Sequence, residues 1–373
     1  MTAHAAALRE LELLLRPAGA GVFVVSTGQA EQRAVQRAIY GATTDAEVEE
    51  RLRARLAGLS SARVVMLGVP SDVGAGYVRG ANLGPQAIRA RMAEDDPNYA
   101  SWLEARGVVD VGDVLVVPQL LSDEMLSEAQ IERTRRACWP DVPDELRRTL
   151  PVSPLSKAER VLDLALSIAP NAAPVVLGGD HSCAWPAVAA LARARREPWG
   201  VVQIDAHTDL LAERLGVRTC FATWSYHANE LLGRGGKLVQ VGIRATRHDR
   251  AHWEGTLGVR QFWADECLRD PAAALDAIAL HVKATGVRGV YFSNDIDGTD
   301  ERFADATGTP EPNGLEPDFV VALMRRLGAE VGLIGGDVME VAPPVARTPD
   351  GARRTVGLAA RYLRETLERL TTR

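Results

Sequence analysis

The sequence predicts a three-layer αβα fold, in which helices cover both faces of a doubly wound, mostly parallel sheet of eight strands. From about residue 60 onward, short apolar runs rich in valine and isoleucine alternate with longer amphipathic stretches, as in a series of βαβ units. The run Val-Val-Met-Leu at 64–67 is apolar on both faces, which is typical of a parallel strand buried between two helical layers.

The apolar runs give the expected positions of the strands, which are 63–69, 107–111, 174–177, 200–204, 238–243, 259–263, 287–292 and 331–334. Between them, amphipathic periodicity predicts helices at 157–168, 185–195, 271–284, 317–327 and 353–370.

Two segments fall outside this alternation. Residues 1–58 have leucines at helical spacing and form a mostly helical N-terminal extension, in which a short strand fits at 21–25. Residues 113–156 contain five prolines around a charged helical piece, and we expect them to be an insertion at the rim of the sheet. We therefore divide the chain into the extension 1–58 and one domain, 59–373, that carries the insertion.

Composition excludes several classes of protein. The 373 residues include 43 basic and 49 acidic side chains, a net charge of −6, which argues against a nucleic-acid or anionic-membrane binder. No apolar run approaches the ~18 residues of a membrane span, and the N-terminus lacks the order of a secretory signal. The four cysteines make no C-x-x-C pair, as expected for reduced thiols in a cytoplasmic protein.

Polar clusters follow four of the predicted strands. They are Gly-Gly-Asp-His-Ser at 178–182, Asp-Ala-His-Thr-Asp at 205–209, Ser-Asn-Asp-Ile-Asp-Gly-Thr-Asp at 293–300 and Gly-Gly-Asp-Val-Met-Glu at 335–340. Because the carboxyl ends of parallel strands form the ligand crevice of an open sheet, we expect the clusters to converge. Within them, Asp180 and Asp337 fit a role in the site and a structural role as helix N-caps or turn residues equally well.

The spacing of acidic and histidine residues in these clusters predicts a metal centre. Asp205, His207 and Asp209 alternate at i, i+2 and i+4, positions that share one side of an extended segment. Close carboxylates repel unless cations neutralise them, and two divalent ions about 3.5–4 Å apart would do so. Carboxylates and imidazoles without thiolates suit Mn²⁺, Ni²⁺ or Fe²⁺, and zinc stays open. The predicted ligands are His181, Asp205, His207, Asp209, Asp295 and Asp297.

The first three of the four clusters resemble the signatures of the ureohydrolase family, which contains arginases, agmatinases and their relatives. Weaker matches, such as those at 84–89, 110–113, 306–310 and 337–343, extend the resemblance over about 60–370, without the extension or the insertion. The resemblance implies a sheet of arginase type and a hydrolase of carbon–nitrogen bonds in linear amidines. A hydroxide shared by the two metals would attack the guanidinium carbon, and the chain would form a homotrimer or homohexamer.

The family resemblance also implies roles for individual residues. It gives His181, Asp205, Asp209 and Asp297 to one metal or to the bridging set, and Asp205, His207, Asp295 and Asp297 to the second metal and the bridges. Glu340 would hold the guanidinium by charge-assisted hydrogen bonds, and Thr309, in a further matching motif, is an expected substrate contact. His227 is the candidate acid or proton shuttle for the leaving amine. Its context, Tyr-His-Ala, departs from the family's His-Gly, so a partly buried helix histidine is the alternative.

The loop after Asp209 favours a small substrate. It carries three aromatic residues, Phe221, Trp224 and Tyr226, whose faces would attract a flat cation and whose bulk would narrow the cavity. This loop and the long extension resemble the guanidine hydrolase branch, which implies free guanidine as substrate and nickel as metal. The alternatives are that the rings only pack a helix onto the sheet, and that the substrate is agmatine or guanidinobutyrate.

Other readings are less consistent with the residues. Arg244 and Arg247 could pair with a carboxylate, as formiminoglutamate would require, although charged residues in such a stretch are usually solvated. A metallophosphoesterase would bring a Gly-Asn-His-Asp element, which is not found. Arginase-fold deacetylases keep one zinc and fewer acidic ligands, and a non-catalytic relative is expected to have lost ligands, whereas all six are present here.

Overall fold

A nine-stranded sheet forms the centre of the computed structural model, which describes residues 3–24 and 28–372. The strand order is β1-β3-β2-β4-β9-β8-β5-β6-β7, and all neighbours are parallel apart from β1 and β3. The strands are β1 Leu15–Arg16, β2 Val64–Val69, β3 Val108–Val114, β4 Ala173–Gly178, β5 Gly200–Ile204, β6 Leu238–Ile243, β7 Arg260–Trp263, β8 Val290–Asn294 and β9 Leu333–Val338.

The eight predicted strands are confirmed, and the ninth, β1, is an addition. This two-residue strand pairs antiparallel with the end of β3, Leu15 with Val114 and Arg16 with Asp113. It is too short to interrupt the helical spacing of leucines before it, so no local pattern marked it. The short strand expected at 21–25 is absent from the described part of that segment, where Val22 makes an isolated bridge to Val116; positions 25–27 lie outside the described residues.

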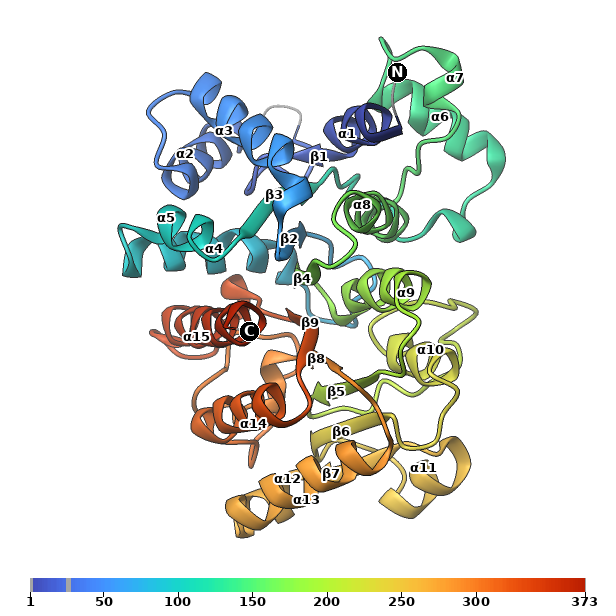
Figure 1. Ribbon diagram of the computed structural model, residues 1–373, viewed down its shortest axis with the longest axis vertical. Helices are drawn as coiled ribbons and strands as arrows, with labels where there is room; N and C mark the ends of the chain where they lie inside the picture. The colour runs from blue at the N-terminus through green and yellow to red at the C-terminus, as the bar shows by residue number, and fades with distance from the viewer. Residues whose placement is uncertain (1–2, 25–27, 373) are drawn as a thin grey trace.

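Helices cover both faces of the sheet, which confirms the three-layer architecture (Figure 1). In the described part of the chain, no helix is both long and apolar enough to cross a membrane. One face is covered by α8 Pro154–Ile168, α9 Trp185–Ala194, α10 Trp224–Leu231 and α11 Arg250–Leu257. The other face is covered by α4 Gly84–Asp95, α5 Tyr99–Glu104, α12 Ala264–Arg269, α13 Pro271–Ala284, α14 Pro317–Glu330 and α15 Gly351–Thr371.

Each face of the sheet has its own hydrophobic core. In β2, Val65 and Leu67 belong to the core beneath α8 and α9, whereas Val64 and Met66 belong to the core beneath α14 and α15. Side chains alternate between the two faces of a strand, so a strand that is apolar at every position is buried on both. This arrangement fixes the sheet rigidly between two helical layers and leaves its carboxyl edge to hold the polar clusters.

The N-terminal helices and the insertion pack against the domain. The extension contains α1 Ala3–Leu14, α2 Gln29–Tyr40 and α3 Asp45–Ala57, and the segment after β3 contains α6 Glu128–Cys138 and α7 Asp144–Arg147. Trp139, after α6, donates its indole hydrogen to the carbonyl of Leu13 at 3.0 Å. Arg160 on α8 binds both carboxylate oxygens of Glu10. The division at residue 58 stays a prediction.

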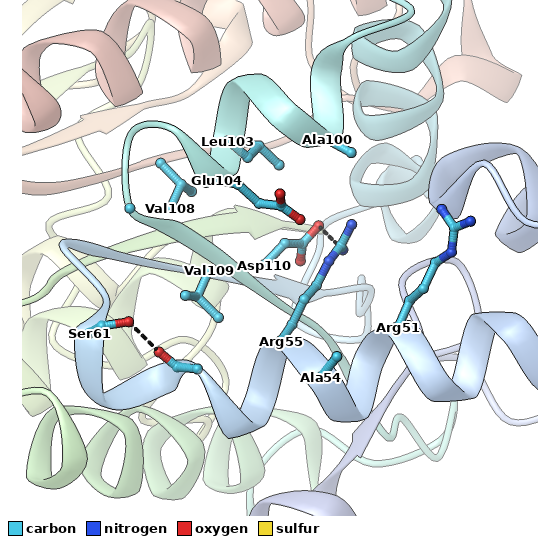
Figure 2. Close-up of a pocket in the computed structure, with 12 residues that line it drawn as sticks. Arg51, Ala54, Arg55, Ser61, Ala100, Leu103, Glu104, Val108, Val109 and Asp110 are labelled. Carbon is cyan, nitrogen blue, oxygen red and sulfur yellow. Dashed lines mark hydrogen bonds and ion pairs between the residues drawn. The ribbon is translucent and has the colours of Figure 1, made fainter.

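A cavity of about 450 Å³ lies between α3, α5 and the first residues of β3. Its wall carries basic and acidic side chains, and Arg55 Nη1 lies 3.8 Å from Asp110 Oδ2 (Figure 2). Because the cavity touches Val108 and Val109 at the start of β3, it lies at the amino edge of the parallel strands. It is therefore separate from the polar clusters, which follow the carboxyl ends.

Candidate metal centre

Four neighbouring strands, β4, β9, β8 and β5, bring the polar clusters together at the carboxyl edge of the sheet. The residues that follow these strands are mostly buried, and their acidic and histidine side chains lie close together at this edge. His181 follows β4, Asp205, His207 and Asp209 follow β5, Asp295 and Asp297 follow β8, and Glu340 follows β9.

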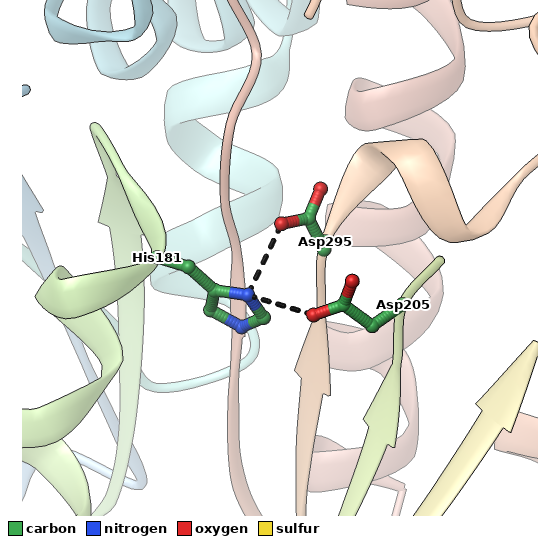
Figure 3. Close-up of side chains that lie close together, drawn as sticks. All are labelled: His181, Asp205 and Asp295. Carbon is green, nitrogen blue, oxygen red and sulfur yellow. Dashed lines mark ion pairs between the residues drawn. The ribbon is translucent and has the colours of Figure 1, made fainter. Parts of the chain in front are cut away.

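The first group of ligands surrounds the imidazole of His181. Its Nδ1 lies 3.1 Å from Asp205 Oδ2, 3.2 Å from Asp209 Oδ2 and 3.1 Å from Asp295 Oδ2. Figure 3 shows Asp205 and Asp295 directed at the same ring nitrogen. All four side chains are buried, and within the described chain Nδ1 has no hydrogen-bond partner of suitable geometry. A buried nitrogen ringed by carboxylate oxygens in this way fits a metal ligand.

A hydrogen-bond chain behind His181 fixes which ring nitrogen faces the carboxylates. Ser293 Oγ lies 3.0 Å from His181 Nε2 and donates its only hydrogen to Asp337, at 2.9 Å from Oδ2. Ser293 must therefore accept from Nε2–H, which leaves the lone pair on Nδ1 free to bind a cation. Sequence reasoning missed Ser293 and left Asp337 open; both orient a ligand, whereas Asp180 is a cap that accepts from Ser182 N at 2.9 Å.

The second group surrounds His207 and shares one carboxylate with the first. His207 Nδ1 lies 3.2 Å from Asp297 Oδ2 and 3.6 Å from Asp205 Oδ1. Asp205 thus turns one oxygen to each imidazole and has a place in both groups. The side chain of His207 is 29% exposed, so this group lies nearer to solvent.

The backbone that carries these ligands differs from the extended segments that we expected. Strand β5 ends at Ile204, and the carboxylate of Asp205 accepts a hydrogen bond from the backbone N of His207 at 2.6 Å. Asp209 has a φ of 52°, in the left-handed region. After β8, Asp295 accepts from the backbone N of Asp297 at 3.0 Å in a 3₁₀ turn. The ligands converge because the chain turns, not because alternate residues of a strand face one way.

This turn also corrects the expected division of ligands. The resemblance placed Asp297 in both sets and Asp295 in the second alone, whereas the structure places Asp295 beside His181 and has Asp297, as expected, beside His207. In a 3₁₀ turn, residues two apart point in different directions. Each of the two carboxylates therefore faces its own imidazole.

The electrostatics of the centre are consistent with bound cations. Burial and the charges of Asp297 and Asp205 raise the pKa of Asp295 well above its ordinary value. Burial and the charge of Asp205 raise the pKa of Asp209 to about 6. In the described structure, the ion pairs of these four carboxylates are made to two imidazoles alone. Buried carboxylates at such distances are stabilised by divalent ions, so the donor set fits the expected metal pair.

Glu340 and Thr309 lie beside the ligands. Glu340 has a φ of 60°, an uncommon conformation for a residue with a side chain, and its carboxylate accepts from the backbone N of His181 at 2.9 Å. Burial and the charge of Asp295 raise its pKa well above the ordinary value. Thr309 is exposed and donates its hydroxyl hydrogen to Asp297 Oδ2 at 3.0 Å.

The aromatic loop lies partly behind the metal ligands. Trp224 has an exposed fraction of 0%, its ring centroid is 4.5 Å from that of His181, and its Nε1 donates to Asp209 Oδ2 at 3.0 Å. The ring that we expected to contact a substrate cation has no free face and instead supports two ligands. Tyr226 is half-buried on α10, and its backbone N donates to the carbonyl of Asp209 at 3.3 Å.

His227 is half-buried on α10, directly after Tyr226. Its Nε2 lies 2.9 Å from the backbone oxygen of Arg218, and its ring meets the rings of Trp185 and Tyr226 edge-on. Burial lowers its pKa, so the ring is neutral near pH 7. Among the described residues, no hydrogen bond or ring contact joins it to the six metal ligands, and its role as an acid stays a prediction.

Comparison with known proteins gives the same family as the site. The family model described as "Arginase family" matches residues 62–368. Proclavaminate amidinohydrolase of Streptomyces clavuligerus is 33% identical over 290 residues, which are 75% of this chain and 80% of that protein. Guanidinobutyrase of Pseudomonas aeruginosa is 28% identical over 301 residues, 78% of this chain and 82% of that protein.

The solved structures agree with the sequence relatives. The crystal structure of proclavaminate amidinohydrolase from Streptomyces clavuligerus superposes with a TM-score of 0.62 at 31% identity and covers 83% of this chain and 92% of that one. The family resemblance drawn from the polar clusters is therefore confirmed. With a family match over most of its length and a relative at 33% identity, this chain belongs to the arginase family and is a hydrolase acting on carbon–nitrogen bonds.

Proposed function

We propose that this protein hydrolyses the guanidino group of a small compound at a pair of divalent ions, Mn²⁺ or Ni²⁺, and that its substrate is free guanidine, which yields urea and ammonia. The observation that carries the proposal is the place of Asp205, with Oδ2 at 3.1 Å from His181 Nδ1 and Oδ1 at 3.6 Å from His207 Nδ1. One carboxylate between two imidazole–carboxylate groups is the arrangement that a metal pair needs.

The chain's own residues supply binding and orientation. When bound, a pair of divalent ions supplies Lewis acidity and lowers the pKa of water toward ~7. A guanidinium, with a pKa of about 12.5–13.8, arrives charged and presents N–H donors in a plane. The carboxylate of Glu340, beside the first ligand group, would accept those donors and hold the guanidinium carbon over the centre.

The leaving amine must receive a proton, and His227 is our candidate to deliver it. Its ring is neutral near pH 7 because burial lowers its pKa. It would therefore first take up the proton released on attack and then pass it to the departing nitrogen. Its position on the helix that also carries Trp224 supports this role, because that helix packs against the ligand His181.

A second candidate substrate is a guanidino acid with a short tail, such as guanidinobutyrate. A cavity of about 300 Å³ lies between the loop after β2, the insertion and the loop after β5. Gly74 is in its wall, and a Cβ at Gly74 would come within 2.8 Å of Asp180 Oδ1, next to the ligand His181. The lining is mainly apolar, and Arg214 lies with its guanidinium 5.1 Å from the centre of the Phe221 ring. Such a pocket suits an aliphatic tail that ends in a carboxylate and disfavours the cationic tail of agmatine.

The test is a substrate panel with Mn²⁺-loaded and Ni²⁺-loaded protein. Guanidine, agmatine, guanidinobutyrate, arginine and formiminoglutamate are supplied in parallel, and urea and ammonia are measured. We expect the highest kcat/KM on guanidine and an unchanged value after Arg214→Ala. A preference for guanidinobutyrate with a KM that rises in Arg214→Ala would favour the second candidate.

The controls separate the metal centre from the substrate. Asp297→Ala should abolish turnover and metal retention, because it removes a carboxylate 3.2 Å from His207 Nδ1. Protein with two ions per chain that releases no product from any compound would contradict the proposal. The resemblance also supports a homotrimer or homohexamer, and light scattering measures the oligomeric state. The free cysteines support a place in the cytoplasm.

A further inference from the structure

We infer that a buried chain of three glutamine side chains, one from each of β5, β6 and β7, positions Asp205 as the shared metal ligand. The inference rests on the metal pair of the proposed function and is independent of the substrate. The three residues, Gln203, Gln240 and Gln261, all have exposed fractions of 0%. They are paired residue to residue across the sheet, Gln203 with Gln240 and Gln240 with Gln261.

The side chains form one continuous line of hydrogen bonds. Gln203 Nε2 donates to Asp205 Oδ2 at 2.7 Å, and Gln240 Nε2 donates to Gln203 Oε1 at 2.9 Å. Gln261 Nε2 donates to Gln240 Oε1 at 2.8 Å, and the indole Nε1 of Trp263 donates to Gln261 Oε1 at 3.0 Å. Because neighbouring strands are about 4.8 Å apart, the line spans about 10 Å from β5 to β7.

The chemistry of the two ends allows only one direction for the line. An ionised carboxylate accepts hydrogen bonds and cannot donate, so Gln203 must present its NH₂ group to Asp205. The amide oxygen of Gln203 then accepts from the NH₂ group of Gln240. In the same way, the amide oxygen of Gln240 accepts from the NH₂ group of Gln261. At the far end, the indole of Trp263 can only donate. Both ends therefore impose the same orientation on all three amides.

The second amide hydrogen of Gln240 binds the backbone beside the metal ligands. Gln240 Nε2 also donates to the backbone carbonyl of Thr208 at 2.5 Å. That carbonyl belongs to the turn between the ligands His207 and Asp209. The line thus holds both the shared carboxylate and the backbone that carries its neighbours.

Aligned amides in a dry interior act on the carboxylate together. Each donor points toward Asp205, so the dipoles add and each hydrogen bond strengthens the next. Removing a partner that orients a metal ligand typically costs about 10–100-fold in metal affinity. Apolar side chains would fill the same positions in three buried strands without the cost of desolvating three amides. A line of amides that ends on the shared ligand is consistent with a role at the metal centre.

The first test removes the bond to Asp205. Gln203→Leu keeps the volume and deletes the donor, while Gln240 retains the Thr208 carbonyl as a partner. We expect dissociation constants for Mn²⁺, measured by competition with a chromophoric chelator, to rise about 10-fold or more. The control is Thr366→Val, which deletes a buried hydrogen bond made by a hydroxyl on α15. We expect it to leave the metal affinity unchanged.

The second test asks whether the distal glutamine acts through the line. Gln261→Leu changes nothing that touches Asp205, yet we expect the dissociation constants to rise about 3-fold, because the aligned donors no longer polarise one another. In a Gln203→Leu background, the same substitution should raise the dissociation constants by less than 3-fold, because only the bond from Gln240 to the Thr208 carbonyl remains to carry its effect. If Gln203→Leu does not fold, Trp263→Phe, at the half-buried end of the line, is compared with Gln261→Leu in its place.

The outcomes separate this inference from the proposed function. Non-additive losses of metal affinity support the line, whether or not any guanidino compound is hydrolysed. A metal affinity in Gln203→Leu equal to that of Thr366→Val would overturn it. Strictly additive effects of the two glutamine substitutions would also overturn it, as would a Trp263→Phe effect that adds in full to that of Gln261→Leu.

Discussion

The two imidazoles of the metal centre differ in their exposure to solvent and in the groups that hold them. His181 is 1% exposed, has three carboxylate oxygens within 3.2 Å of Nδ1, and is held from behind by Ser293. His207 keeps 29% of its side chain exposed, and its nearest carboxylate, that of Asp297, accepts from the exposed Thr309 hydroxyl and from the buried backbone N of Ala206. The inner group is thus fixed by buried partners, whereas one supporting donor of the outer group, the Thr309 hydroxyl, is in contact with water.

This difference indicates how the two ions should behave. Hydrogen bonds in a buried, low-dielectric setting are stronger and hold their geometry, whereas exposed ones compete with water. We therefore expect the ion at His207 to exchange first with a chelator and the ion at His181 to leave last. Asp205 belongs to both groups, so it is the residue whose loss should remove the contrast altogether.

Asp205→Asn is the largest expected effect. The substitution keeps the shape of the side chain and removes the charge that both groups share, so neither ion should be retained. We expect turnover to fall about 10³-fold or more and metal analysis to find fewer than one ion per chain. Asp318→Asn, at an exposed ion pair with Arg361, is the matched control. Retention of two ions by Asp205→Asn would refute the shared position.

The pH dependence of the metal-free protein tests the burial of the inner group. The pKa of Asp209 in the folded protein, about 6, lies above that of an unfolded chain, about 3.9. The folded state therefore binds the proton more tightly, and this stability is present below pH 4 and lost as pH rises through 6. Relative to Asp209→Asn, we expect the unfolding free energy to fall by about 3 kcal/mol over this window.

Urea unfolding with a chelator, from pH 4 to pH 8, measures this difference. The raised pKa of Asp295 acts in the same direction. Protein loaded with metal should not show the fall, because the ions stabilise the ionised carboxylates. A metal-free protein that gains stability relative to Asp209→Asn as pH rises would contradict the electrostatics of the inner group.

Ser293→Ala probes the partner behind His181. It leaves the buried Nε2 without its acceptor at 3.0 Å and frees the ring to turn, so we expect metal affinity to fall about 10–100-fold. Chelator competition should show the loss at the more tightly bound ion. Weaker binding of the weakly bound ion alone would contradict the assignment of the tightly bound ion to His181.

The sequence predicted most of the fold because the signal was local. The strand at 238–243 was predicted with its observed bounds, since its apolar run is bounded by polar residues. Strand β1 was missed because two residues carry no periodicity and their place depends on pairing with residues about a hundred positions away. Local patterns thus gave the parallel core and failed at its antiparallel edge.

The six predicted ligands lie together as expected, but their arrangement was not predicted, and their role as ligands stays a prediction. Parallel strands end at one edge, so the clusters had to meet there, and His181 and Asp205 do so. Asp295 was wrongly left out of the group around His181, because the chain turns in a 3₁₀ helix after β8. The glutamine line depends on register across three strands, and its signal was one glutamine inside each of three buried runs.

Thr309→Val should have the smallest effect of these substitutions, and its effect on metal affinity is compared directly with that of Ser293→Ala. Both substitutions delete one hydroxyl that supports the metal centre, one in water and one buried. The Thr309 hydroxyl lies 3.0 Å from Asp297 Oδ2, and water can replace it at an exposed position. We expect the affinity for the weakly bound ion to fall only about 2–3-fold, near the low end for a hydrogen bond. If Thr309→Val costs as much as Ser293→Ala, exposure does not set the strength of the two groups, and the outer ion is held by contacts other than those of Asp297.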